Sequence, residues 1–413
     1  MKYKNSLVFA ISLICFGIVS AQTRYVGGDI SLLPEYENAG AKYRDTDGST
    51  INNLLPYLYD QGMNAMRVRL FVDPSAFAGN DPNACQDLPY ILPLCQRIVE
   101  NGFDLMLDFH YSDTWADPVA QWIPKAWEGL TDEELIEKIY EYTKDTLSTL
   151  RAAGVVPAFI QPGNEISYGM LWSPYGAPAS EQHKTLSTSS DENWQRLGAL
   201  LNSAIKACRE ECPEAKIIIH TERVAKIAVQ TNFYNRMKTL GVDYDIIGLS
   251  YYPYFHGNMS VLNLALTSLE SIFPEKDIMI VETGYSYKWE VPGTTEKVDY
   301  PYSAAGQDAF AKDLVETLLA HPKVIGLFWW WMEYNAYGTK LSGWYNAPLF
   351  DSQTGKATPA LKTICTFGTG HSGIESVVVP SIETDIWHDL QGRRIQQPSR
   401  PGIYIHDGKK IAL

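Results

Sequence analysis

The chain has 413 residues, of which 45% are hydrophobic and 20% are charged, a composition typical of a globular protein with a large core. Its formal charge of −14 argues against nucleic-acid binding, which needs a surface rich in lysine and arginine, and disfavours polyanionic substrates while leaving neutral ones open. The 11 Trp and 25 Tyr residues suit a large core, and they also suit a cleft that binds sugars.

The first 21 residues have the pattern of a secretory signal peptide. Lys2 and Lys4 precede an apolar run from Leu7 to Val19, and a small-residue cleavage site ends at Ala21. An uncleaved membrane anchor is the alternative, but the run is short for one, and no later stretch approaches the roughly 18 apolar residues of a membrane span. We therefore expect an exported protein without a transmembrane segment. Cleavage removes two lysines and no acids, which changes the formal charge from −14 to −16.

Eight apolar, β-branched segments alternate with longer helical patterns. The expected strands are Tyr25–Gly28, Ala65–Phe71, Asp104–His110, Val156–Gln161, Lys216–His220, Asp245–Ser250, Asp277–Glu282 and Val324–Trp330. Parallel strands joined by helical crossovers, eight in number over roughly 350 residues, predict an α/β fold of the (β/α)8 TIM-barrel type. One expected helix begins after the capping pair Thr131 and Glu134 and ends at Gly154.

Five cysteines remain after cleavage, and an odd number leaves at least one thiol free. Cys85 and Cys95 could form a disulfide around a loop, whereas Cys208 and Cys212, four apart in a predicted helix, seldom reach disulfide geometry. Cys365 completes the set. We expect buried structural thiols, and no spacing resembles a zinc site.

The chain changes character near its C-terminus. We expect the catalytic domain to span residues 22–367 and a small-residue linker to span 368–373. Residues 374–413 hold five acids and five bases and predict short strands at 376–379, 386–390 and 402–406. This β-rich tail is too small for a substantial core of its own, so it is expected to be an accessory or sorting element.

Two of the predicted strand ends supply a glutamate. In a (β/α)8 barrel the reactive side chains come from the carboxyl ends of the strands. Glu165 follows the fourth strand and Glu282 ends the seventh, which places them across the barrel mouth from each other. A single glutamate is usually solvated or salt-bridged, but two at these positions match the acid and nucleophile of glycoside hydrolysis.

Neighbouring residues fit supporting roles in that chemistry. Asn164 is placed to bind a sugar 2-hydroxyl, and Arg67 to hold Glu282 ionised and oriented. Arg69 has the same in–out parity as Arg67 and could take that role instead. Tyr252 could donate to the nucleophile or simply pack.

Tryptophans at two strand ends are candidates for sugar stacking. Trp115 and Trp330 could stack on the apolar face of a sugar, although core packing is the usual role of a single tryptophan. Three in succession, at 329–331, are harder to bury together because neighbours on a strand point opposite ways. His110 could contact a sugar or act as a structural hydrogen-bonding group. It has no partner histidine at ligand spacing, so a catalytic metal is not expected.

A run of eleven residues from Asp108 to Pro118, DFHYSDTWADP, carries a family resemblance. The same resemblance is supported by the blocks GMNAMRVR (62–69), QPGNEI (161–166), GLSYYPY (248–254), VET (281–283) and GLFWW (326–330). On these motifs the segment from Tyr25 to Phe367 resembles glycoside hydrolase family 53, the secreted endo-β-1,4-galactanases. The resemblance implies a retaining (β/α)8 hydrolase.

The resemblance also implies roles for individual residues. It makes Glu165 the acid/base and Glu282 the nucleophile, and it places Trp115 and Trp330 near the cleaved bond. The full set of substrate-binding or supporting residues expected is Arg67, Asp108, His110, Asp113, Trp115, Asn164, Tyr252 and Trp330.

Some stretches depart from the family pattern. His220-Thr-Glu-Arg223 replaces an acidic-Gly-Trp stretch that the resemblance associates with distal minus subsites, and Trp331-Met-Glu333 replaces a Glu-Pro pattern. No cofactor is expected for catalysis. Bacterial relatives hold Ca²⁺ between two loops, and oxygen ligands for such a structural ion are available here from Asp299, Asn335, Asn346 and Asp351. The tail segments 389–394 and 402–405 resemble Bacteroidetes C-terminal sorting or accessory tails.

The sequence therefore predicts an exported, monomeric, retaining endo-β-1,4-galactanase acting on galactan side chains of pectin or on galacto-oligosaccharides. Two alternatives stay open. One is another endo-glycanase of the same clan, such as a β-mannanase or a xylanase, and the other is a non-catalytic barrel that binds galactan.

Overall fold

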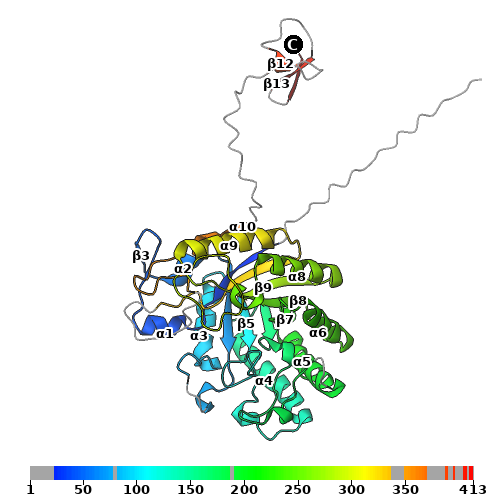
Figure 1. The fold of residues 1–413 in the computed structure, drawn as a ribbon. Coiled ribbons are helices and arrows are strands. Elements are labelled where there is room, and N and C mark those ends of the chain that lie inside the picture. Colours follow the sequence, from blue (N-terminus) through cyan, green and yellow to red (C-terminus); the bar gives the residue numbers. More distant parts are fainter. Residues whose placement is uncertain are drawn as a thin grey trace, which may run out of the picture. The chain divides into compact units, whose positions relative to one another are not determined.

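The computed structural model describes residues 23–77, 81–186, 190–335 and 348–369, together with the backbone of four short strands between 387 and 412 (Figure 1). The predicted signal peptide, residues 370–373 of the predicted linker, the predicted strand 376–379 and the candidate calcium ligand Asn346 lie outside the described residues. The chain forms two compact units, Met1–Gly370 and His371–Leu413.

The first unit is a closed barrel of eight parallel strands. Around the barrel the order is β1-β10-β9-β8-β7-β6-β5-β4, with β4 pairing back to β1. The strands are β1 (Tyr25–Asp29), β4 (Ala65–Leu70), β5 (Asp104–Phe109), β6 (Phe159–Pro162), β7 (Lys216–Thr221), β8 (Ile246–Tyr251), β9 (Asp277–Thr283) and β10 (Val324–Trp329). The predicted (β/α)8 fold is confirmed.

The fourth predicted strand begins later than expected. The prediction starts at Val156, whereas β6 starts at Phe159 and its ladder to β5 begins there. Pro157 has no N–H to donate to a ladder, and the side chain of Val156 is 55% exposed. These residues form the connection into the strand.

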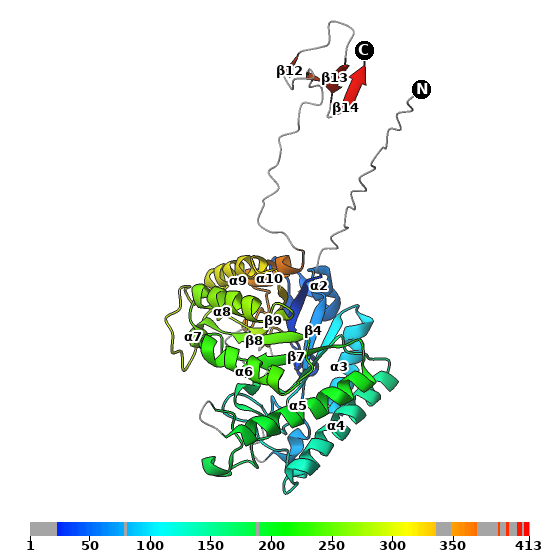
Figure 2. The same ribbon diagram turned by 90° about the vertical axis from the view of Figure 1, so that its right-hand side faces the viewer.

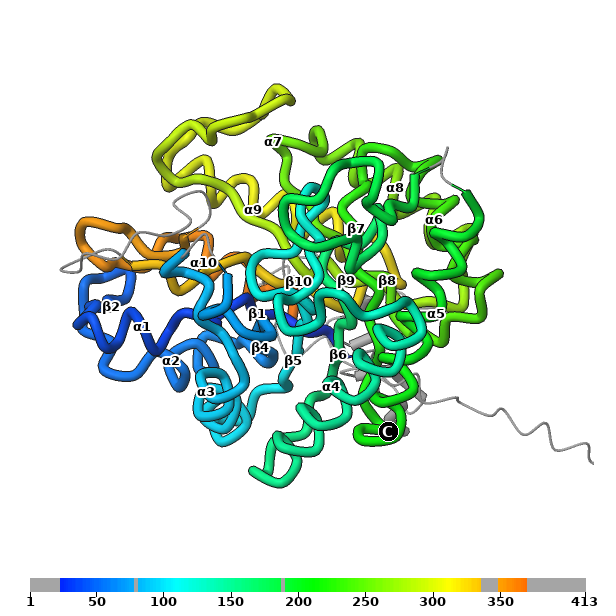
Figure 3. Tube along the Cα trace, turned by 90° about the horizontal axis from the view of Figure 1, so that it is seen from below, coloured from blue at the N-terminus to red at the C-terminus, as the bar shows by residue number. Residues whose placement is uncertain are grey.

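Helices surround the strands, as the tube view shows (Figure 3). They are α1 (Leu33–Asn38), α2 (Leu54–Asp60), α3 (Leu88–Glu100), α4 (Asp132–Ala152), α5 (Asp191–Glu211), α6 (Ile227–Thr239), α7 (Pro253–His256), α8 (Met259–Ile272), α9 (Ala304–Leu319) and α10 (Pro359–Thr369). Short 3-10 turns lie at Pro74–Ala76, Lys125–Trp127, Ile166–Tyr168 and Ala179–Glu181, and the hairpin of β2 (Tyr43–Arg44) and β3 (Thr50–Ile51) stands apart from the barrel.

Helix α4 shows how local sequence sets an element. Thr131 accepts a hydrogen bond from the Glu134 N–H, and the Glu134 carboxylate accepts one from the Thr131 N–H, which completes the predicted capping box. Buried positions such as Ile139 and Leu147 face inward at helical spacing. Helix α5 runs beside α4 (Figure 2).

The barrel has a core inside the ring and another outside it. The inner cluster takes residues from nearly every strand, including Met106, Phe159 and Met279, with Tyr25 packing edge-on against Phe159. The much larger outer cluster fills the layer between the strands and the helices. This double core holds the strand ends rigidly, which is what a precise site requires.

Strand β9 carries one extra residue just before Glu282. Against β8 the register moves from Leu249↔Ile280 to Ser250↔Glu282, and against β10 it moves from Leu327↔Ile280 to Trp329↔Thr283. This is a β-bulge, which turns the side chains that follow it. Val281 belongs to the inner core and Glu282 still reaches the barrel mouth.

The second unit contains a small antiparallel sheet. Its order is β12-β11-β13-β14, with β11 (Trp387–His388), β12 (Arg394–Ile395), β13 (Ile403–His406) and β14 (Lys409–Ala412). The expected β-rich character of the tail is confirmed.

All five cysteines of the described part of the chain are free thiols, and all but Cys85 are buried. The helices within the described ranges include none with the length and apolar character to cross a bilayer.

Candidate active site

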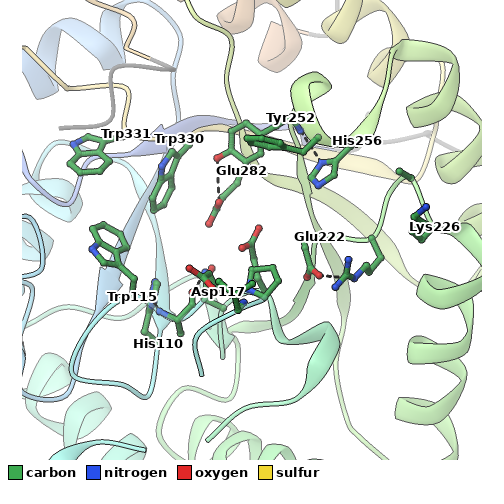
Figure 4. Close-up of a pocket in the computed structure, with 18 of the residues that line it drawn as sticks. His110, Trp115, Asp117, Glu222, Lys226, Tyr252, His256, Glu282, Trp330 and Trp331 are labelled. Carbon is green, nitrogen blue, oxygen red and sulfur yellow. Dashed lines mark hydrogen bonds and ion pairs between the residues drawn. The ribbon is translucent and has the colours of Figure 1, made fainter. Parts of the chain in front are cut away.

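A cleft of about 860 Å³ opens at the carboxyl ends of the barrel strands and contains both predicted glutamates (Figure 4). Glu165 and Glu282 are among its lining residues, together with Asp117. The figure shows tryptophans at one end of the cleft and polar side chains at the other, with Glu282 and Asp117 between them.

Glu282 is held by a cation and a phenol. Its Oε1 lies 2.9 Å from Nη2 of Arg67, and its Oε2 accepts a hydrogen bond of 3.3 Å from the Tyr252 hydroxyl. The carboxylate is 5% exposed. Burial raises the pKa of Glu282 to about 7, although Arg67 and the Tyr252 hydrogen bond oppose that shift by stabilising the charged form.

Arg67 is the centre of a buried charge network. Its Nη2 donates to Asp108 at 2.7 Å and to the Asn164 side-chain oxygen at 2.9 Å, and its Nη1 lies 3.5 Å from Asp29. Burial favours a raised pKa for Asp108, but Arg67 together with His110 and His220 outweighs it and holds the pKa of Asp108 below its usual value. The network therefore presents an arginine of fixed position to Glu282.

The geometry distinguishes the two predicted arginines. Arg67 contacts Glu282, whereas Arg69 forms an ion pair of 2.6 Å with Asp29. Both side chains are fully buried. Arg69 thus reaches the nucleophile candidate only indirectly, through the aspartate that both arginines share.

Glu165 stands on an unusual backbone. It follows β6 by three residues and has φ of 49° and ψ of 50°, the left-handed region that a non-glycine residue adopts at some cost. Gly163, with φ of 94°, makes the preceding turn, where a Cβ atom would lie 2.8 Å from the side chain of Ile166. The turn aims the Glu165 carboxylate into the cleft.

The surroundings of Glu165 favour its protonated form. Its Oε1 accepts a hydrogen bond of 2.6 Å from Ser250, and none of the described cations forms an ion pair with it. Burial raises the pKa of Glu165 well above its ordinary value, and the charges of Glu282 and Glu222 raise it further. Since Glu282 has Arg67 beside it, a proton shared by the two carboxyl groups resides on Glu165.

One buried imidazole links the residues around Glu165. Nε2 of His220 lies 2.8 Å from the Ser250 hydroxyl, and Nδ1 lies 2.9 Å from the Asn164 side-chain oxygen. The backbone N–H of Glu165 also points to Nδ1, at 3.3 Å. Burial lowers the pKa of His220, and the nearby charge of Arg67 lowers it further, so the ring is neutral. Neither His220 nor Ser250 was predicted to have a role in the site.

The first end of the cleft, which we call the aromatic arm, consists of Trp115, Trp330, Trp331 and Arg69. The Arg69 guanidinium carbon lies 4.7, 5.2 and 5.0 Å from the ring centres of the three tryptophans, respectively. Such contacts are favourable cation–π interactions.

The expectation that three successive tryptophans would resist burial is wrong. Trp329 is fully buried and packs against Phe310, while Trp330 and Trp331 are 8% and 4% exposed. Trp330 lines the cleft, and Trp331 donates its indole N–H to the Tyr36 hydroxyl. Arg69 packs against the rings of Trp330 and Trp331, whereas Trp329 is enclosed by the core around Phe310.

Two other predicted residues hold the walls of the cleft. His110 accepts a hydrogen bond from the Ala116 N–H at its Nδ1, and its Nε2 lies 3.1 Å from Asp108, while its ring also lines the cleft. Asp113 accepts hydrogen bonds from the backbone N–H groups of Asp73 and Lys125. Asp113 is absent from the lining residues of this cleft, so the structure shows it tying two loops together.

The opposite end, which we call the polar arm, was not predicted. It consists of Glu222, Arg223, Lys226, Phe255 and His256, all of which line the cleft. Glu222 is 6% exposed and forms an ion pair of 2.8 Å with Arg223. The only sign of the polar arm in the sequence was the departure of residues 220–223 from the family pattern.

Two of the four candidate calcium ligands, Asp351 and Asn335, are engaged in local bonds. The Asp351 carboxylate accepts hydrogen bonds from Gln353 and Thr354 in its own turn, and the Asn335 amide donates to the Lys42 carbonyl. Within the described ranges, no group of three or more His, Cys, Asp and Glu residues has an arrangement that fits a metal ion. Neither the sequence nor the described residues show a structural calcium site.

The sequence of this chain matches a known family and proteins described as its members. The family model for glycosyl hydrolase family 53 matches residues 25–364. A protein from Aspergillus fumigatus described as a probable arabinogalactan endo-beta-1,4-galactanase A is 31% identical over 353 residues, covering 81% of this chain and 92% of its own.

Solved structures agree with that match. The Ignisphaera aggregans GH53 catalytic domain is 31% identical, with a TM-score of 0.72, and the match covers 84% of this chain and 96% of that one. A structure from a study of two fungal beta-1,4-galactanases is 28% identical with a TM-score of 0.69, covering 83% and 99% of the two chains. The resemblance inferred from the sequence motifs is confirmed.

Proposed function

The chain belongs to glycosyl hydrolase family 53, and from that premise we propose that it is an exported, retaining endo-β-1,4-galactanase that hydrolyses the galactan side chains of pectin. The observation that carries the proposal is the unequal environment of the two glutamates in one cleft. Glu282 lies beside Arg67, and Glu165 lies beside a neutral serine. Such a pair suits a nucleophile and an acid, respectively.

In the first step Glu282 attacks the anomeric carbon. Arg67 and the Tyr252 hydroxyl hold its carboxylate in position and favour the ionised form. At the same time Glu165 gives its proton to the leaving oxygen, which breaks the glycosidic bond and leaves a galactosyl ester on Glu282.

In the second step Glu165 acts as a base. Esterification removes the negative charge of Glu282, and that charge is one cause of the raised pKa of Glu165. The pKa of Glu165 therefore falls once the ester forms, so its carboxylate can take a proton from water. The water attacks the anomeric carbon as it loses that proton, the ester bond to Glu282 breaks, and the galacto-oligosaccharide leaves with the β configuration retained.

The substrate class follows from charge and from the named relatives. Galactan is neutral, which suits a protein of formal charge −14 better than a polygalacturonate backbone does. Two relatives that match this chain over nearly all of their own length are described as beta-1,4-galactanases. Asn164, fixed by Arg67 and His220, is placed to bind the 2-hydroxyl of the sugar that is attacked.

Digestion of linear β-1,4-galactan tests the proposal. We expect oligosaccharides of mixed length early in the reaction, as from internal cleavage, and proton NMR is expected to show the β-anomer first. Release from mannan or xylan in place of galactan would favour another endo-glycanase. Binding to galactan without release of reducing ends would favour a non-catalytic barrel, and initial formation of the α-anomer would overturn the retaining mechanism.

A further inference from the structure

The polar arm contains hydrogen-bonding capacity that the proposed mechanism does not use. Oε1 of Glu222 is engaged by Arg223 and by the Ser167 hydroxyl. Oε2 of Glu222 is buried and finds no hydrogen-bond partner among the described residues. An unpartnered buried carboxylate oxygen costs free energy unless a ligand completes it.

Arg223 offers the complementary donors. Its Nε donates to Ser167 at 3.1 Å and lies 2.8 Å from Glu222, and its guanidinium carbon lies 4.1 Å from the centre of the Tyr168 ring. These contacts fix the plane of the group. Neither Nη atom donates to any residue that the structure describes, so both are available to the cleft.

An aromatic ring completes the set. Phe255 lines the cleft, is partly exposed and packs edge-on against His256, which lies at the same end of the cleft as Glu222 (Figure 4). A carboxylate acceptor, a fixed guanidinium donor and an aromatic ring are the groups that bind a pyranose. The acceptor and donor bind adjacent hydroxyls, and the ring packs on an apolar face.

The position of Glu222 and Arg223 relative to the two catalytic glutamates decides on which side of the cleaved bond they bind a sugar unit. Ser167 and Tyr168, which hold Arg223, belong to the turn directly after Glu165. Trp330, at the other end of the cleft, lies against Arg67, the partner of Glu282. Figure 4 likewise shows Glu222 and Trp330 on opposite sides of Glu282. A proton donor lies on the side of the leaving oxygen, so the polar arm is on the leaving-group side.

We propose that Glu222 and Arg223, with Phe255, form a subsite that binds the vicinal 2- and 3-hydroxyls of a galactose unit on the leaving-group side of the cleaved bond. In a β-1,4-linked chain O4 carries the linkage, so these two hydroxyls are the free adjacent pair. This inference rests on the proposed galactanase function. It assigns residues 220–223 to the leaving-group side rather than to distal minus subsites, and it makes the enzyme intolerant of branches at O2 or O3 of that unit.

Kinetics on two substrates test the subsite. Galactopentaose fills both sides of the cleft, whereas an aryl β-1,4-galactobioside places no sugar hydroxyls on the leaving-group side. Arg223→Met is expected to lower kcat/KM on galactopentaose roughly 10- to 100-fold, the loss typical of a hydrogen bond to a charged group, and to lower it far less on the aryl substrate. It is also expected to lower the ratio of transglycosylation to hydrolysis when galactobiose is added as acceptor.

Two further variants complete the design. Glu222→Gln keeps the size of the side chain and is expected to show the same split, so it carries the test if Arg223→Met does not fold. As a control, Arg97→Met removes a surface arginine that also pairs with a glutamate, Glu37. It should leave kcat/KM unchanged on both substrates. Equal losses on both substrates would overturn the subsite. Absence of any wild-type activity on galactan would instead overturn the proposed function, and with it the subsite that depends on it.

Discussion

The aromatic arm and the polar arm of the cleft are supported in different ways. Arg69 is fully buried and is held by Asp29 and by three tryptophan rings. Arg223 is partly exposed and is held by Glu222 and by the turn that follows Glu165. The aromatic arm is thus continuous with the barrel core, whereas the polar arm belongs to the loop after β7 and to α7, which follows β8. We expect substitutions in the first to affect folding and substitutions in the second to affect mainly substrate choice.

The largest effects are expected where the two arms meet. Glu282→Ala should lower kcat roughly 10⁴- to 10⁶-fold, because the covalent step is lost. Glu165→Ala should lose activity on galactan to a similar degree but retain more on substrates with good leaving groups, which need no proton. Added azide should restore turnover in both, giving the α-galactosyl azide with Glu282→Ala and the β-azide with Glu165→Ala. Substantial galactan activity in either variant would show that the roles are wrongly assigned.

The same substitution in each arm tests the comparison directly. Arg69→Met leaves the buried Asp29 without its nearest cation and should cost about 3–5 kcal/mol in the free energy of unfolding. Arg223→Met should cost less, about 1–3 kcal/mol, since Arg223 is itself 19% exposed although its loss leaves the buried Glu222 without a cation. Urea denaturation of the two variants at one pH measures both values. Similar losses would remove the distinction between the arms.

Replacing one aromatic ring in each arm sharpens the comparison in catalysis. Trp330→Ala should lower kcat/KM about 10-fold on both galactopentaose and the aryl galactobioside, because a sugar occupies that end of the cleft in either case. Phe255→Ala should lower it mainly on galactopentaose. The comparison fails if both variants lose the same factor on each substrate.

Stability should depend on pH through a carboxyl group beneath the aromatic arm. Glu333 is fully buried, and burial together with the charge of Asp29 raises its pKa to about 8, against about 4.3 in an unfolded chain. Between these values the native state holds a proton that the unfolded state has lost, so this group makes the protein less stable as pH rises. Glu333→Gln does not titrate.

The gain in stability from Glu333→Gln should therefore grow from about pH 4 to about pH 8 and then level off. Thermal unfolding of the wild type and the variant across that range provides the measurement. A difference in Tm that is independent of pH would contradict the buried, protonated state of Glu333.

The smallest expected effect is a change in the pH profile from the polar arm. The negative charge of Glu222 is one cause of the raised pKa of Glu165. Glu222→Gln removes that charge, so the pKa of Glu165 falls and the alkaline limb of kcat/KM for galactan, whose leaving group needs the proton, moves to lower pH. A shift to higher pH, or an unchanged limb, would show that Glu222 does not act on Glu165.

The sequence predicted the barrel and the positions of both glutamates because each strand is a compact apolar run that ends in polar residues. Strict alternation along the seventh strand does not reveal the extra residue before Glu282, because a bulge depends on pairing with both neighbouring strands. Pro157 did signal the later start of β6, since a residue without an N–H is unsuited to a ladder.

The polar arm and the burial of the tryptophans could not be predicted for a different reason. Glu222 and Arg223 are adjacent in sequence and resemble an ordinary surface pair until the turn after Glu165 is placed beside them. The enclosure of Trp330 and Trp331 involves Arg69, which is some 260 positions earlier in the chain. Both features arise from contacts between distant loops, which local patterns do not encode.

The shared imidazole of His220 has an evolutionary consequence. Because the same ring contacts Asn164 and, through Ser250, Glu165, a single change at position 220 would disturb both the contact with the sugar that is attacked and the proton donor. A lineage adapting this scaffold to another sugar would therefore meet strong epistasis at these four positions. The loop after β7 acts on Glu165 only through the charge of Glu222 and the turn at Ser167, so it is less constrained, and divergence in substrate preference within the lineage should accumulate there first.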